Sequence, residues 1–193
     1  DLFVFVGDNH YANSGDLGAL WWNYRVALEV PERAALLAAA PQLATWDDHD
    51  FVGDNTDRTA PGRASALRAF ADYQPNPSFG DPAEPGVFTR ARWGDLDFFL
   101  LDVRYERDPA GPPAARILGA RQAAWLEAEL LRSTATFKFI VSGTIFSPTG
   151  DETWRDYPAS RDRLSGALAG VFRRRALDDE AIEELETALL TSD

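Results

Sequence analysis

The sequence predicts an α/β protein built around a parallel sheet. Short apolar runs rich in phenylalanine and valine alternate with longer segments of helical periodicity, a pattern typical of βαβ units. The run Leu2–Val6 (LFVFV) is apolar at every position, as expected of a strand covered on both faces. The chain has 193 residues, of which 45% are hydrophobic, so it is long enough for one domain with a substantial core.

Each predicted element has a local signal. Gly7-Asp8-Asn9 ends the first strand, and Pro31 opens a helix because the first turn does not need its missing N–H group. Gly94-Asp95 joins an alternating segment at 87–93 to a largely apolar segment at 97–104 and predicts a hairpin. The predicted elements are strands at 2–6, 43–46, 87–93, 97–104 and 137–142, and helices at 16–28, 31–40, 64–73, 119–132 and 178–190.

Composition limits the classes of function. Acidic residues outnumber basic residues by 31 to 19, which gives a net charge of −12. Affinity for nucleic acids rests largely on basic groups that meet phosphates, so we expect no nucleic-acid platform. A small phosphate ester held by a metal ion is compatible with this charge, because a cation reverses the local field. The chain has no cysteine and no apolar run long enough to cross a bilayer.

Acidic and basic side chains lie at or just after the carboxyl ends of three of the predicted strands. Ligands of open α/β sheets bind beyond the carboxyl ends of strands, so these side chains are expected to converge. Oxygen-rich ligands with a single histidine favour hard cations such as Ca²⁺, Mg²⁺, Mn²⁺ or ferric iron. The residues are, in chain order, Asp8, then Asp47, Asp48 and His49 within ATWDDHDFVGDN, then Asp102 and Arg104.

Each of these features also has a simpler interpretation. Gly7-Asp8 is compatible with a plain turn, WDDHD with a helix cap or surface loop, and Asp102 with an ion pair to Arg104. His10 is expected to be solvated, and Asp47 and Asp50 are candidates for orienting His49. The sequence contains no G-x-S-x-G, P-loop or G-x-G-x-x-G pattern, which disfavours serine hydrolysis and a nucleotide cradle.

Several stretches, taken in order, resemble the PhoD-like phosphatases, the alkaline phosphatase D branch of the metallophosphatases. The combination of GD-x-x-Y, WDDH[DE] and D-x-R is specific as a set. The resemblance covers residues 1–164, and residues 165–193 are interpreted as an atypical tail that carries an acidic helix. The matching stretches are GDNHYA from Gly7, ATWDDHDFVGDN from Ala44, ALRAFADYQPNP from Ala66, GVFTRARWGDLDFFLLDVRYERDP from Gly86, ILGARQAAWLEAELLRSTATFKFIVSG from Ile117 and ETWRDYPASRDRL from Glu152.

This resemblance implies a metallophosphatase-like, four-layer α/β sandwich that is partial in this chain. It also implies hydrolysis of phosphate monoesters or diesters at a binuclear metal centre. In the best-known type the metals are ferric iron and calcium, with other divalent metals as alternatives. The implied metal ligands are Asp8 as a bridge, Tyr11 as a phenolate on iron, Asp48, and Asp54 or Asn55; the implied catalytic residues are His49 and Arg104.

Relative to the family pattern, we expect the chain to be incomplete at both ends. An acidic residue before GD-x-x-Y and a later SGD-x-H are absent, and no histidine follows His49. The resemblance suggests an exported protein, although no signal peptide is visible. The alternative to a phosphoesterase is a non-catalytic acidic α/β module that binds a metal or a protein partner. The sequence leaves the oligomeric state and the activity of this chain by itself open.

Overall fold

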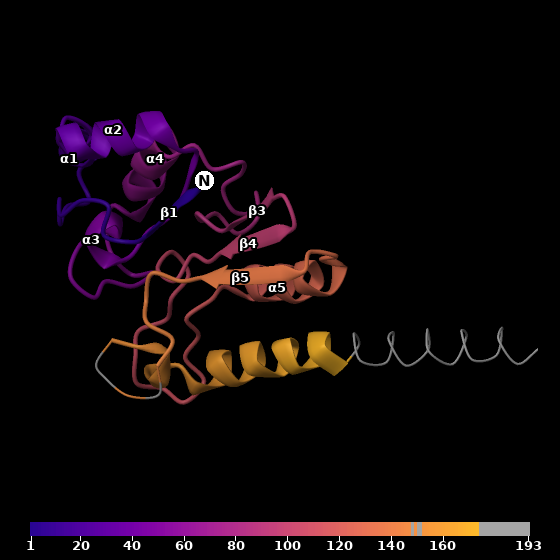
Figure 1. Cartoon of the computed structure of the whole chain (residues 1–193). Coiled ribbons are helices and arrows are strands. Elements are labelled where there is room, and N and C mark those ends of the chain that lie inside the picture. The colour runs from indigo at the N-terminus through magenta and orange to yellow at the C-terminus, as the bar shows by residue number, and fades with distance from the viewer. Residues whose placement is uncertain (148, 150–151, 174–193) are drawn as a thin grey trace, which may run out of the picture.

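A computed structural model describes residues 1–147, 149 and 152–173 (Figure 1). The predicted elements up to residue 142 are present with shifted ends, and residues 158–173 add a helix that was not predicted. The predicted acidic helix at 178–190 lies outside the described residues. The elements are β1 (Phe3–Val6), α1 (Leu17–Leu28), α2 (Pro31–Ala39), β2 (Gln42–Thr45), α3 (Asp48–Phe51), α4 (Arg63–Tyr73), β3 (Thr89–Trp93), β4 (Leu96–Leu100), α5 (Ala120–Arg132), β5 (Phe137–Val141) and a short 3₁₀ helix (Trp154–Asp156).

The strands form two small sheets. β1 pairs in parallel with β2 after the crossover through α1 and α2. β3 and β4 form the predicted antiparallel hairpin, and β5 lies parallel to β4 after the crossover through α5. The carboxyl ends of β1 and β2 therefore meet at one edge, and those of β4 and β5 meet at another.

The side chains that alternate along the strands show that these sheets are the two inner layers of a four-layer arrangement. Leu43 of β2 packs between the sheets against Phe98 and Leu100 of β4. The next residue of β2, Ala44, faces the other way, into a cluster with α1 and α4. Phe99 of β4 likewise faces outward, toward α5 and the helix at 158–173. Because side chains in strands alternate between faces, the order is helices, sheet, sheet, helices, which confirms the expected α/β sandwich.

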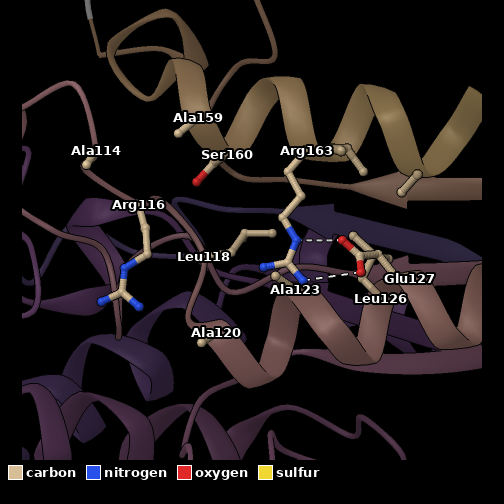
Figure 2. A pocket seen from close by; sticks show the side chains of 12 residues that line it. Ala114, Arg116, Leu118, Ala120, Ala123, Leu126, Glu127, Ala159, Ser160 and Arg163 are labelled. Atoms are coloured by element: carbon tan, nitrogen blue, oxygen red, sulfur yellow. Dashed lines mark hydrogen bonds and ion pairs between the residues drawn. The ribbon is translucent and has the colours of Figure 1, made fainter.

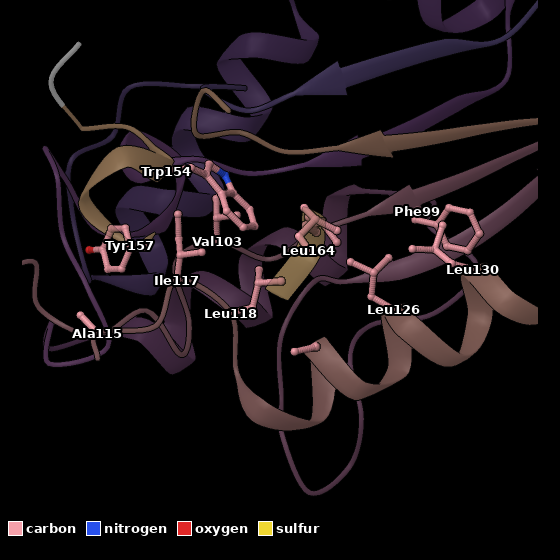
Figure 3. Close-up of a cluster of buried hydrophobic side chains, with 12 residues drawn as sticks. Phe99, Val103, Ala115, Ile117, Leu118, Leu126, Leu130, Trp154, Tyr157 and Leu164 are labelled. Atoms are coloured by element: carbon pink, nitrogen blue, oxygen red, sulfur yellow. The ribbon is translucent and has the colours of Figure 1, made fainter. Parts of the chain in front are cut away.

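The outer cluster beside β4 explains why residues 158–173 form a helix. Leu164 is 7% exposed and packs with Leu126 and Leu130 of α5, as Figure 3 shows. Leu168 and Val171 pack against the same cluster, and their spacing from Leu164 is that of one helical face. This apolar spacing was a usable signal in the sequence.

The first strand differs from the expectation. Phe3 is 38% exposed and Val6 is 57% exposed, so β1 is not covered on both faces. Within the described residues β1 pairs only with β2, which leaves one of its edges open. None of the helices in the described part of the chain is long and apolar enough to span a bilayer.

Candidate metal centre

The residues Asp8, Asp47, Asp48 and His49, called the acidic cluster below, lie where the two sheets come together. The loops after β1 and β5 both pack on Asp47, which follows β2. A Cβ atom at Gly7, whose φ is +112°, would lie 2.8 Å from the Asp47 Cβ atom. A Cβ atom at Gly143 would lie 2.9 Å from the same atom. Glycine is thus required at both positions because the backbones approach Asp47 too closely for a side chain.

The loop GDNH after β1 is tied to α3 through Asp50. One Asp50 carboxylate oxygen accepts hydrogen bonds from the backbone N–H of Asp47 at 3.1 Å and from the side-chain amide of Asn9 at 3.2 Å. The other oxygen accepts from the backbone N–H of His10 at 3.2 Å. Burial raises the pKa of Asp50 to about 7, against the opposing effect of these donors. Asp50 therefore anchors the loop, and in the described part of the chain its carboxylate makes no hydrogen bond to the His49 ring, contrary to the orienting role considered from the sequence.

The side chains of Asp8, Asp48 and His49 converge. Each offers one potential ligand atom, and these atoms lie within 4.8 Å of one another. Asp48 belongs to a second such group with the exposed residues Asp54 and Glu152. The Oδ1 atom of Asp8 is buried and has no hydrogen-bond partner within the described residues. Burial of a carboxylate oxygen without a hydrogen-bond donor costs free energy, which a bound cation would offset. Two carboxylates and an imidazole are ligands that suit a hard cation.

The Asp48 carboxylate is held by backbone groups on both sides. Its Oδ1 atom accepts from the N–H of His49 at 3.0 Å, and its Oδ2 atom accepts from the N–H of Asn55 at 2.6 Å. Asn55 adopts a positive φ of 49°, a conformation that asparagine tolerates better than most residues. The turn after α3 is thereby closed onto Asp48.

Tyr11 and His49 lie at the exposed side of the cluster. The Tyr11 hydroxyl donates to Asp8 Oδ2 at 2.9 Å, and its ring lies 4.3 Å from the His49 ring. The hydrogen bond to Asp8, followed by the charge of that carboxylate, raises the pKa of Tyr11. The Nδ1 atom of His49 lies 2.6 Å from Asn13 Oδ1. Because an amide oxygen only accepts, Nδ1 is the donor in this pair, and Nε2 is the nitrogen that is left to accept a proton.

Arg104 is 1% exposed and is paired inside the cluster. Its Nε atom donates to Asp47 Oδ1 at 2.6 Å, and its Nη2 atom lies 3.9 Å from Asp48 Oδ2. Thr144, after β5, donates to Asp47 Oδ1 at 3.1 Å and accepts from Arg104 at 3.3 Å. Thr144 was not among the predicted site residues, although it follows a predicted strand. Asp47 is therefore the partner of Arg104, and among the described residues its carboxylate makes no hydrogen bond to the His49 ring.

Asp102 has a scaffold role and is not ion-paired with Arg104. Its carboxylate accepts from the Trp46 indole at 2.9 Å and from three backbone N–H groups, at 2.8 to 2.9 Å. Burial raises the pKa of Asp102, while these donors act in the opposite direction. His10 also differs from the expectation, because it is only 6% exposed and packs edge-on against Tyr24. Burial and nearby Arg33 lower the pKa of His10 to about 4.

A separate apolar cavity of about 300 Å³ lies between α5 and the helix at 158–173 (Figure 2). Its walls are mostly alanine and leucine. The guanidinium group of Arg163 is turned toward Glu127 and donates to it at 2.5 Å. The cavity is lined by none of the converging acids, so we place the candidate metal centre in the acidic cluster instead.

The layers and the acidic cluster at the strand ends define a metallophosphatase-like α/β sandwich. A family model for PhoD-like phosphatases matches residues 22–193, and the chain belongs to that family. Asp8 and Tyr11 precede the matched residues, so their place in the site rests on the geometry.

Two relatives illustrate the likeness. Alkaline phosphatase D of Bacillus subtilis (strain 168) is 28% identical, over 66% of this chain and 28% of that protein. A solved structure of PhoD superposes with a TM-score of 0.69 at 22% identity, over 89% of this chain and 43% of that one. The chain thus spans less than half the length of either relative.

Proposed function

We propose that this chain carries part of the active site of a metal-dependent phosphoesterase that hydrolyses phosphate monoesters or diesters. The observation that supports the proposal is the convergence of ligand atoms from Asp8, Asp48 and His49 within 4.8 Å. These residues come from segments about 40 positions apart, and they meet beside the buried cation of Arg104. Membership of the PhoD-like phosphatase family supports the same reaction class.

Asp8, Tyr11, Asp48 and Asp54 are the residues proposed to hold the metals. The unpartnered Oδ1 atom of Asp8 supports this role, because a cation would satisfy it. Ferric iron and calcium are the proposed pair, and a ferric ion would favour the deprotonated form of Tyr11. When bound, such ions would neutralise phosphate charge and polarise the phosphoryl group.

His49 and Arg104 are proposed to bind and orient the phosphate substrate. His49 presents an acceptor at Nε2, because its Nδ1 proton is held by Asn13, so His49 is proposed to exchange a proton with a ligand oxygen. Arg104 neutralises Asp47 and lies 3.9 Å from Asp48. Its positive charge therefore reduces the repulsion between the acidic cluster and an anionic substrate. Arg104 thus contributes electrostatically, with its Nε atom committed to Asp47.

A non-catalytic metal-binding module is the second candidate. The observation in its favour is the small number of ligands, since each group of converging ligand atoms in the described residues comes from three side chains, whereas calcium takes about six oxygen ligands. In this case the acidic cluster would bind metal without turnover. The family resemblance also supports export of the protein, for either function.

Metal binding and turnover can be tested separately. The protein is reconstituted with iron and calcium, and we expect a visible tyrosinate-to-iron charge-transfer band that disappears in Tyr11→Phe but survives in Tyr73→Phe. Hydrolysis of p-nitrophenyl phosphate should fall by a factor of about 100 or more in Asp8→Asn, as for removal of other groups that act on the transition state. The exposed control Asp162→Asn should keep full activity.

The two candidates give different outcomes. Metal binding that depends on Asp8, without hydrolysis, would support the non-catalytic module. Hydrolysis that survives intact in Asp8→Asn would exclude the proposed centre.

A further inference from the structure

Arg107 is a buried cation near the proposed metal centre, and it has no role in the proposed reaction. It is 2% exposed, and its guanidinium carbon lies 5.1 Å from the centre of the Tyr157 ring. Its Nε atom donates to the Tyr157 hydroxyl at 2.6 Å, and its Nη2 atom donates to Asn55 Oδ1 at 2.8 Å. Its Nη1 atom is buried without a hydrogen-bond partner in the part of the chain that the structure describes.

Within residues 1–147, 149 and 152–173, Arg107 has no carboxylate partner for its charge. Among the described residues, no ion pair joins its guanidinium group to an acid. The neighbouring arginines differ in this respect, since Arg104 pairs with Asp47 and Arg58 pairs with Asp108. Burial of a cation without a counter-ion costs free energy. The two hydrogen bonds of Arg107 do not remove this cost, so we look for a functional role of its charge.

The contact with Asn55 fixes the orientation of that side chain. A guanidinium group only donates, so the Asn55 atom that faces Arg107 must be the oxygen. The Nδ2 donor of Asn55 is then the group left over, and no described residue accepts a hydrogen bond from it. Asn55 is exposed, and its backbone N–H group donates to Asp48 at 2.6 Å. The residue is thus held against the acidic cluster by its backbone and oriented by Arg107.

We propose that Arg107 is a positioning residue that turns the Asn55 amide so that its Nδ2 group donates to an oxygen of the bound phosphate group. The inference rests on the proposed function and assigns Asn55 a role different from the metal ligand expected from the sequence. An oxygen that already accepts from a guanidinium cation is a poor ligand for a second cation, because the like charges repel. A neutral N–H donor beside carboxylates offers phosphate oxygens the hydrogen bond that those acids cannot give.

The test compares variants of Asn55 in the metal-loaded protein. Binding of inorganic phosphate and of calcium is measured by calorimetry. Asn55→Asp keeps an acceptor for Arg107 but replaces the donor with an anionic oxygen. We expect its phosphate affinity to fall about tenfold or more, as for loss of one hydrogen bond to a charged group. Calcium affinity should be unchanged or higher, because a carboxylate is added.

A double-mutant cycle shows whether Arg107 acts through Asn55. Arg107→Gln and Asn55→Ala should each weaken phosphate binding, and the double variant should be no weaker than Asn55→Ala alone. Arg58→Gln, which alters a nearby exposed arginine, is the matched control and should bind phosphate normally. If Arg107→Gln does not fold, Tyr157→Phe removes one acceptor of the guanidinium group and retains the ring, and it takes the same place in the cycle.

The outcomes separate this inference from the proposed function. Failure of the unchanged protein to bind phosphate with metal would overturn both. Normal phosphate binding by Asn55→Asp, or loss of calcium in Asn55→Ala with phosphate binding retained, would overturn the positioning role alone. Multiplicative effects in the double variant would show that Arg107 acts independently of Asn55 and would overturn the positioning role.

Discussion

Replacing Asp102 with asparagine tests whether this acid is a scaffold or part of the ligand site. Its Oδ1 atom accepts from Trp46, Arg104 and Tyr105, and its Oδ2 atom accepts from the backbone N–H group of Val87. Asparagine keeps one oxygen for the first three donors and sets its NH₂ group against the Val87 N–H group. The buried Val87 N–H group is then left without its acceptor, which costs about 1–3 kcal/mol.

Loss of the carboxylate charge weakens the other three hydrogen bonds as well, because charge-assisted bonds are about twice as strong as neutral ones. Relief of the burial penalty that raises the pKa of Asp102 offsets part of this loss. We therefore expect the free energy of unfolding to fall by about 3 kcal/mol in Asp102→Asn, a value assembled from the same hydrogen-bond energies.

Urea unfolding followed by tryptophan fluorescence measures this change. Asp162→Asn, at a side chain that is 71% exposed, should change the free energy of unfolding by less than about 0.5 kcal/mol. A loss below about 1 kcal/mol in Asp102→Asn, smaller than one unsatisfied buried donor, would refute the scaffold role. Loss of calcium binding in a fully stable variant would place Asp102 in the metal centre.

Two further predictions concern packing. Gly143→Ala should lower calcium affinity at least tenfold, because the new Cβ atom would lie 2.9 Å from the Asp47 Cβ atom and push α3 away from the loop; unchanged calorimetric binding would contradict this close packing. Leu126→Ala, in the cluster between α5 and the helix at 158–173, should lower the free energy of unfolding by about 2–5 kcal/mol. Leu131→Ala, at a residue that is 46% exposed, is its control in urea unfolding, and equal losses in both variants would argue against the packing shown in Figure 3.

Local patterns in the sequence were sufficient for most of the fold. The spacing of apolar residues, Pro31 and the Gly94-Asp95 turn each act over a few positions, so their consequences can be read without a structure. The helix at 158–173 carried the same kind of signal in Leu164, Leu168 and Val171 but was overlooked. The exposure of Phe3 and Val6 in β1 differs from the expected coverage on both faces, because that coverage depends on which helices and sheets pack against the strand.

The sequence by itself determined which residues gather at the site, because parallel strands deliver their carboxyl-terminal residues to common edges. Asp8, Asp48 and His49 were found in this way. Only the tertiary structure decided what each acid does. Asp48 faces the cluster, whereas Asp102 faces backbone donors inside the core. The pairing of Arg107 with Asn55 was likewise decided by tertiary structure, because hydrogen bonds between positions 52 residues apart depend on how the layers pack and leave no periodic trace in the chain.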